Sequence, residues 1–89
     1  MRVLAIDPGL TRCGIGVIES NGMSLIAVGV LKSSADSAIE SRLKDIDAQI
    51  REWILFHQPD VIAIERVFSQ QNLRTVMGTA QVAGIALLA

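Results

Sequence analysis

The stretch MRVLAIDPGLTRCGIGVIE, residues 1–19, decides the fold of this chain. It opens with a short apolar run, residues 3–6, that stops abruptly at Asp7. A run that is apolar on both faces and bounded by turn residues is typical of a strand inside a covered sheet. Pro8 and Gly9 then predict a turn, because proline presets φ and glycine accepts positive φ. Asp7 is therefore expected at the rim of the sheet, where open α/β sheets bind their ligands.

The residues after this turn predict two further strands that run back and forth beside the first. Residues 13–19 indicate an antiparallel return strand, and Asn21-Gly22 is a hairpin signal directly after it. Residues 23–32 then predict a third strand. Two glycines in the return strand leave little side chain on one of its faces, which permits the close approach of a ligand or another element.

A helix and a fourth strand follow these three strands. Ser37 and Glu40 match a capping box, and apolar residues then recur at helical spacing. Residues 60–65 repeat the opening pattern, because a short apolar run again ends on an acid, Glu65. A second helix, rich in small residues, is predicted from Asn72 to the end of the chain.

The predicted fold is an α/β fold with a mixed sheet in the strand order 3-2-1-4. A right-handed crossover carries the fourth strand past the second, so that it pairs in parallel with the first. Asp7 and Glu65 then stand at the carboxyl ends of neighbouring strands about 4.8 Å apart. Either acid alone would be an ordinary turn residue. Both at corresponding strand ends indicate a metal site.

The chemistry of such a site follows from its two carboxylates. Two unpaired carboxylates at this separation repel each other, and a hard divalent cation relieves the repulsion. Mg²⁺ suits sites that combine carboxylates, water and phosphate. Two such ions about 4 Å apart would activate water and stabilise the leaving oxygen in phosphodiester cleavage.

The composition restricts the other function classes. A net charge of −1 and a pI of about 5.7 give no bulk basic signature for nucleic-acid binding. Cys13 is the only cysteine and is expected to be buried, which excludes an internal disulfide and fits a reducing compartment. No secretory leader and no membrane span is predicted, so a cytoplasmic location is expected. A hydrophobic content of 51% suggests apolar faces that pack against a partner or a continuation of the chain.

These motifs resemble the RuvC family of bacterial Holliday junction resolvases, within the ribonuclease H-like superfamily. The resemblance covers essentially all 89 residues, but only about the first half of the family's length. Residues 1–89 are therefore expected to be the N-terminal part of a single ribonuclease H-like nuclease domain. The matching segments are residues 6–9, 14–17, 59–68 and 78–84, together with Asn72.

The resemblance implies a homodimeric, Mg²⁺-dependent endonuclease that nicks two opposing strands of a four-way DNA junction symmetrically, with Mn²⁺ as a substitute ion. It also implies RuvA and RuvB as partners in branch migration, and dimerisation through the second helix. Asp7 and Glu65 correspond to the first two catalytic metal ligands. Phe68 resembles an aromatic residue that stacks on bases. The residues expected to contact DNA are Arg12, Arg66, Phe68, Gln70, Gln71, Asn72 and Arg74.

The chain departs from the family in one respect. The family completes its site with a further pair of ligands, usually two aspartates on a C-terminal helix, and no such helix exists in this chain. The isolated 89-residue chain is therefore expected not to cleave junctions, whereas a full-length parent would.

Three other interpretations stay open. A YqgF-type ribonuclease H-like RNA nuclease shares the acid–glycine turn, but it usually lacks Pro8 and the run at residues 65–68. An actin-like ATP-binding domain would use the same turn to bind phosphate through magnesium. A non-catalytic dimerisation module would need neither acid.

Overall fold

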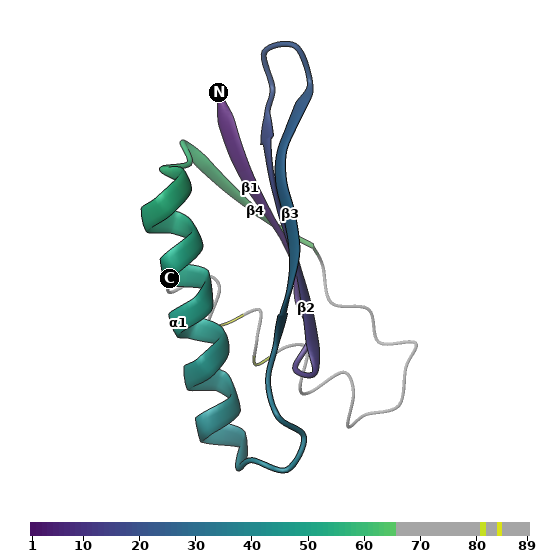
Figure 1. The fold of residues 1–89 in the computed structure, drawn as a ribbon, viewed down its shortest axis with the longest axis vertical. Coiled ribbons are helices and arrows are strands. Elements are labelled where there is room, and N and C mark those ends of the chain that lie inside the picture. The colour runs from purple at the N-terminus through teal and green to yellow at the C-terminus, as the bar shows by residue number, and fades with distance from the viewer. Residues whose placement is uncertain (66–80, 82–83, 85–89) are drawn as a thin grey trace.

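The computed structural model describes residues 1–65, 81 and 84. Its strands form one mixed sheet in the order β3-β2-β1-β4, and α1 lies along one face of that sheet (Figure 1). The predicted α/β fold and strand order are therefore confirmed. The elements are β1 (Arg2–Asp7), β2 (Arg12–Glu19), β3 (Ser24–Lys32), α1 (Ile39–His57) and β4 (Val61–Ile64).

The second predicted helix falls mostly outside the described residues. Gln81 and Gly84 are both helical, and the other residues of that segment are not described. The expected dimer contact through this helix therefore stays a prediction.

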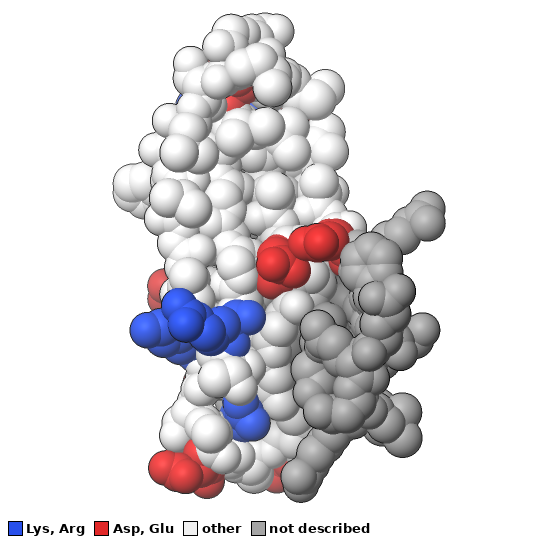
Figure 2. All heavy atoms as spheres, turned by 90° about the vertical axis from the view of Figure 1, so that its right-hand side faces the viewer, with Lys and Arg blue, Asp and Glu red and all other residues white. Residues whose placement is uncertain are grey.

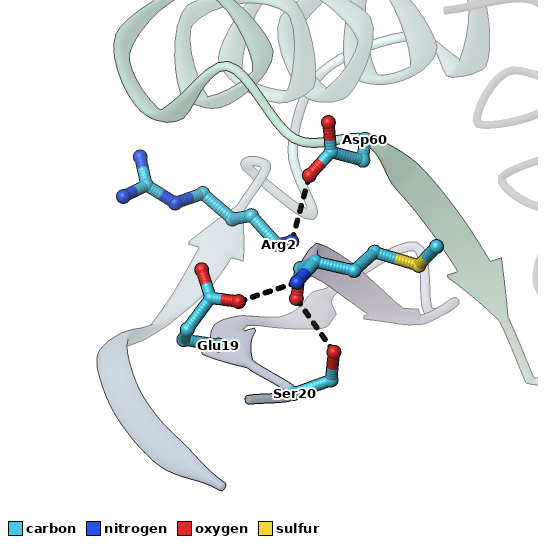
Figure 3. A network of polar contacts seen from close by, with 5 residues as sticks. Arg2, Glu19, Ser20 and Asp60 are labelled. Atoms are coloured by element: carbon cyan, nitrogen blue, oxygen red, sulfur yellow. Dashed lines mark hydrogen bonds and ion pairs between the residues drawn. The ribbon is translucent and has the colours of Figure 1, made fainter. Parts of the chain in front are cut away.

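The start of β1 is tied to both of its neighbouring strands by polar contacts (Figure 3). The terminal ammonium of Met1 pairs with Glu19 at 2.6 Å, and Ser20 Oγ donates to the carbonyl oxygen of Met1 at 2.9 Å. The backbone amide of Arg2 donates to Asp60 Oδ2 at 2.8 Å. The ammonium lowers the pKa of Glu19 by hydrogen bonding to its carboxylate. These contacts hold the first residues of β1 between the end of β2 and the start of β4.

The core lies between the sheet and α1. Alternate residues of β1 and β2 point to the helix, because side chains alternate between the two faces of a strand. The buried residues are Leu4, Ile6, Cys13, Ile15, Val17, Leu31, Ile46 and Ile50. Cys13 is among them, as expected for a small apolar residue, and burial raises the pKa of its thiol.

The opposite face of the sheet is not covered by any described element. Ala5 and Asp7 of β1 are exposed there, and so are Val28 (73%) and Val30 (45%) of β3. The sequence pattern predicted that β1 is covered on both faces. Among the described residues, only the face toward α1 is covered. This leaves a largely apolar sheet surface, which Figure 2 shows as an uncharged area above the acidic groups.

The start of α1 differs from the prediction. Ala38 is the N-cap residue and no side chain caps the helix, so the predicted capping box of Ser37 and Glu40 is wrong. The backbone amide of Ser37 donates to the carbonyl oxygen of Ser34 at 3.2 Å. Ser37 therefore belongs to the turn before the helix, and the helix begins after the extended residue Ala38.

The β2–β3 hairpin has a longer loop than the two-residue turn predicted from Asn21-Gly22. Glu19 pairs with Ser24, and the left-handed backbone conformations occur at Gly22 (φ 92°) and Met23 (φ 55°). The pairing register also shifts next to Val17. The loop thus spans four residues, and its left-handed positions come one residue later than an Asn-Gly turn would place them.

Gly29 of β3 leaves space for the indole of Trp53 on α1. A Cβ atom built on Gly29 would lie 2.9 Å from Cζ2 of the Trp53 indole. We expect Gly29→Ala to lower the free energy of unfolding by about 1–3 kcal/mol, because the bulky ring must move out of its packed position. The urea unfolding midpoint measures this change.

Gly16→Ala is the matched control for this substitution. A Cβ atom on Gly16 would meet Ala27 O at 3.7 Å, which is ordinary van der Waals contact. Gly16→Ala should therefore leave the midpoint unchanged or raise it slightly, because alanine restricts the unfolded chain. Equal midpoints for the two variants would contradict the proposed role of Gly29.

Candidate metal and nucleic-acid site

Asp7 and Glu65 leave neighbouring strands at the same level of the sheet. β1 and β4 are parallel, with Ile6 opposite Ile64, and Glu65 N donates to Ile6 O at 2.9 Å. Ile6 is buried against α1, so the next residue, Asp7, lies on the opposite face. Both acids are exposed. The structure therefore brings together the two acids that the sequence pattern predicted to meet.

The two carboxyl groups interact directly. A hydrogen bond with Asp7 raises the pKa of Glu65, the negative charge of Asp7 raises it further, and partial desolvation adds a smaller effect in the same direction. A carboxyl whose pKa is raised by a second carboxylate beside it marks a place where negative charge accumulates when both groups ionise. Such a place attracts a cation.

The acids stand at the edge of a shallow hollow on the open face of the sheet. The hollow has a volume of about 610 Å³, and the residues that line it include the small residues Ala5, Gly14 and Ala63. Gly14 lies opposite Asp7, and a Cβ atom there would already touch Asp7 Cβ at 3.4 Å. Figure 2 shows acidic groups in the middle of this face and basic groups below and to the left of them. The glycine thus keeps the approach to the carboxylates open, as the sequence pattern suggested.

The turn that connects β1 to β2 is held by side chains from a distant part of the chain. Ser33 Oγ donates to the carbonyl oxygen of Leu10 at 2.6 Å. Arg42, on the first turns of α1, donates from Nε to Ser33 Oγ at 3.0 Å and from Nη2 to Thr11 Oγ1 at 3.1 Å. This network connects the helix to the turn that follows Asp7. The sequence pattern does not predict it, because its members come together only when α1 packs on the sheet.

Gly9 allows this turn to be tight. A Cβ atom on Gly9 would overlap the carbonyl oxygen of Arg12, so no side chain fits at this position. The prediction of a turn at Pro8-Gly9 is thus supported by a close backbone approach. Arg12, the first residue of β2, is exposed at the end of the turn.

The two acids form only part of a metal-binding set within the described residues. In residues 1–65, 81 and 84, no group of three or more histidine, cysteine or acidic side chains lies close enough together to hold a metal ion. Of the predicted DNA contacts, only Arg12 is described; Arg66, Phe68, Gln70, Gln71, Asn72 and Arg74 lie outside the described residues. In the described ranges, no helix has the length and hydropathy that a membrane crossing requires.

The strand order, the parallel β1–β4 pair and the helix that joins β3 to β4 define a ribonuclease H-like fold. The chain belongs to the RuvC family within this class, because the family model for crossover junction endodeoxyribonuclease RuvC matches residues 3–89.

Relatives and solved structures agree with this family. The chain is 53% identical over 92 residues to crossover junction endodeoxyribonuclease RuvC of Saccharopolyspora erythraea, covering 100% of the chain and 46% of that protein. It is also 53% identical to the RuvC of Mycobacterium ulcerans, covering 50% of that protein. The structure of T. thermophilus RuvC in complex with a Holliday junction substrate matches with a TM-score of 0.85 and 29% identity, over 99% of this chain and 56% of that one. The chain thus spans about half the length of the relatives it matches.

The pKa of Glu65 provides a direct test of the contact between the two acids. Asp7→Asn should lower the pKa of Glu65, because the substitution removes both the negative charge and the carboxyl partner that raise it. The Glu65 Cδ chemical shift, followed by NMR across a pH titration, measures the change. Glu40→Gln, on the exposed surface of α1, is the control and should not alter this titration.

The same contact predicts the sign of a pH effect on stability. Because the pKa of Glu65 is raised in the folded chain, its stabilising contribution is present below the unfolded-state pKa and is lost as the pH rises through the folded-state value. The Asp7→Asn variant should lack this loss. An identical pH dependence of unfolding in wild type and variant would show that the two carboxyls do not interact.

Proposed function

We propose that this chain is the N-terminal part of a Mg²⁺-dependent endonuclease that resolves four-way DNA junctions by nicking two opposing strands symmetrically. The observation that carries the proposal is the pair of interacting carboxyls, Asp7 and Glu65, at the ends of parallel strands β1 and β4. Membership of the RuvC family supports it. So does the likeness to a RuvC structure that contains a Holliday junction substrate.

The residues present fit a magnesium ion. The donors are two exposed carboxylates, the oxygen ligands that Mg²⁺ prefers. A hydrogen bond with Asp7 and the negative charge of Asp7 both raise the pKa of Glu65, which is consistent with a place that favours a cation. Asp7 and Glu65 would hold the ion, and Mn²⁺ is expected to substitute for it. When bound, the ion supplies charge neutralisation and an activated water for phosphodiester hydrolysis. The open hollow beside the acids leaves room for a DNA strand to reach them.

The remaining parts of the active protein are proposed from the family. The chain spans about half of its relatives, so we expect the other half to supply the further pair of metal ligands. Residues 1–89 would then be the first part of one nuclease domain. We expect a homodimer formed through the second helix, a cytoplasmic location, and RuvA and RuvB as partners.

The alternatives receive less support. The family match favours neither a YqgF-type RNA nuclease nor an actin-like ATP-binding domain, since the matching family and relatives are crossover junction endodeoxyribonucleases. A dimerisation module without catalysis gives no reason for two repelling carboxyls on the open face.

Asp7→Asn tests the proposed nuclease in the full-length protein. We expect junction nicking to fall by at least about 100-fold, because changes even in groups that only support a metal ligand cost 10- to 100-fold. Binding to four-way DNA in the absence of metal should persist, since the exposed Asp7 does not support the fold. Nicking of a labelled junction and a gel-shift assay measure the two quantities. Asp47→Asn, on α1, is the control with wild-type nicking.

The isolated 89-residue chain tests the proposed division of the site. Because two carboxylates cannot complete a two-metal site, this chain should not nick a four-way junction at any Mg²⁺ concentration that supports the full-length protein. Robust Mg²⁺-dependent nicking by the purified chain would overturn the idea that the second half supplies essential ligands.

A further inference from the structure

Two basic side chains lie directly opposite each other on the sheet. Arg12 of β2 pairs in register with Lys32 of β3, and both side chains are exposed. Side chains at directly opposed positions have Cβ atoms about 4.5–5.5 Å apart, so like charges there destabilise the sheet. The sequence pattern does not reveal Lys32 as part of this site, because only the strand register places it beside Arg12.

Within the part of the chain that the structure describes, no acid forms an ion pair with Arg12 or Lys32. The ion pairs of the described residues are those of Met1 with Glu19 and of Arg51 with Asp47. The segment after Glu65 contains no aspartate or glutamate at all. The two positive charges therefore face solvent without a carboxylate partner from these side chains.

The pair lies on the same face of the sheet as the acids. Arg12 is two residues from Gly14, and Gly14 pairs with Asp7, so the alternation of side chains puts Arg12 and Asp7 on one face. Lys32 is likewise two residues from Val30, the partner of Gly14 on β3. Two residues along a strand cover about 6.8 Å. Figure 2 shows basic groups beside the acidic groups on this face.

We propose that Arg12 and Lys32 form a phosphate-binding site for the DNA backbone, next to the phosphate that approaches Asp7 and Glu65. This inference rests on the proposed nuclease function. The chemistry follows from the charges: the acid pair takes a phosphate through a metal ion, whereas the basic pair binds a phosphate directly. A bound phosphate also relieves the repulsion between the two cations. Arg12 was expected to contact DNA from the family resemblance, and Lys32 is the new member.

The local structure prepares Arg12 for this role. Thr11, its neighbour, accepts a hydrogen bond from Arg42, and a Cβ atom on Gly9 would overlap the Arg12 carbonyl oxygen. The hydrogen bond from Arg42 therefore ties the residue next to Arg12 to α1 before DNA arrives. A binding group that is already ordered loses less conformational entropy on binding.

The salt dependence of DNA binding tests this site in the full-length protein. Lys32→Gln should weaken binding to four-way junctions of different sequence to the same extent, because a phosphate contact carries no sequence information. The slope of log K against log salt concentration should become shallower by about 1. Lys44→Gln removes the same charge from the exposed surface of α1, on the other face of the sheet, and should leave the slope near that of wild type.

Two further measurements separate the possible outcomes. Lys32→Arg keeps the positive charge and should therefore show the wild-type slope. The urea unfolding midpoint of Lys32→Gln should be no lower than that of wild type, because the substitution removes the repulsion between Arg12 and Lys32. Equal slopes for Lys32→Gln and Lys44→Gln, on four-way and duplex DNA alike, would overturn the phosphate site. Wild-type protein that binds four-way DNA no better than duplex would instead overturn the proposed junction nuclease, while the slopes on duplex would still decide on Lys32.

Discussion

The parallel pairing of β1 with β4 is the constraint on which the site depends. The hydrogen bond from Glu65 N to Ile6 O fixes the two strand ends at one level. Asp7 and Glu65 are separated by most of the chain, and neither has a local reason to meet the other. A hydrogen bond with Asp7 raises the pKa of Glu65, and the negative charge of Asp7 raises it further, so the pairing brings two like charges together when both groups are ionised. Burial of Leu4 and Ile6 against α1 stabilises the same pairing, so the core supports an unfavourable charge arrangement on the open face.

The two faces of the sheet have different roles: one packs the core and the other presents the candidate site. The α1 face is packed closely, to the point that Gly29 has no room for a side chain beside Trp53. The other face has a hollow that is lined partly by small residues, with two acids at its edge and exposed valines on β3. Strand alternation separates these tasks residue by residue, because each residue belongs to one face only. The described residues thus already contain a packed core on the α1 face and the two acids of a candidate site on the other.

The open face carries two pairs of like charges, one pair acidic and the other basic. The acids stand at the ends of β1 and β4, and the bases stand opposite each other on β2 and β3. Each pair is unfavourable alone, and each becomes favourable with a ligand of the other sign. The net charge of −1 hides this arrangement completely. A nearly neutral chain can therefore present a local surface suited to a metal ion and a phosphate backbone together.

The sequence by itself determined the elements and their order. The apolar runs, the turn at Pro8-Gly9 and the helical spacing before residue 57 specified three strands, a helix and a fourth strand, and the handedness of the crossover then left one arrangement for Asp7 and Glu65. Only the tertiary structure decided the details that depend on register and packing. The contact of Gly29 with Trp53, the hydrogen bond from Arg42 to Thr11 and the pairing of Lys32 with Arg12 all join residues that no local pattern connects. Local propensity acts over a few residues, whereas these contacts exist only after distant segments have packed against one another.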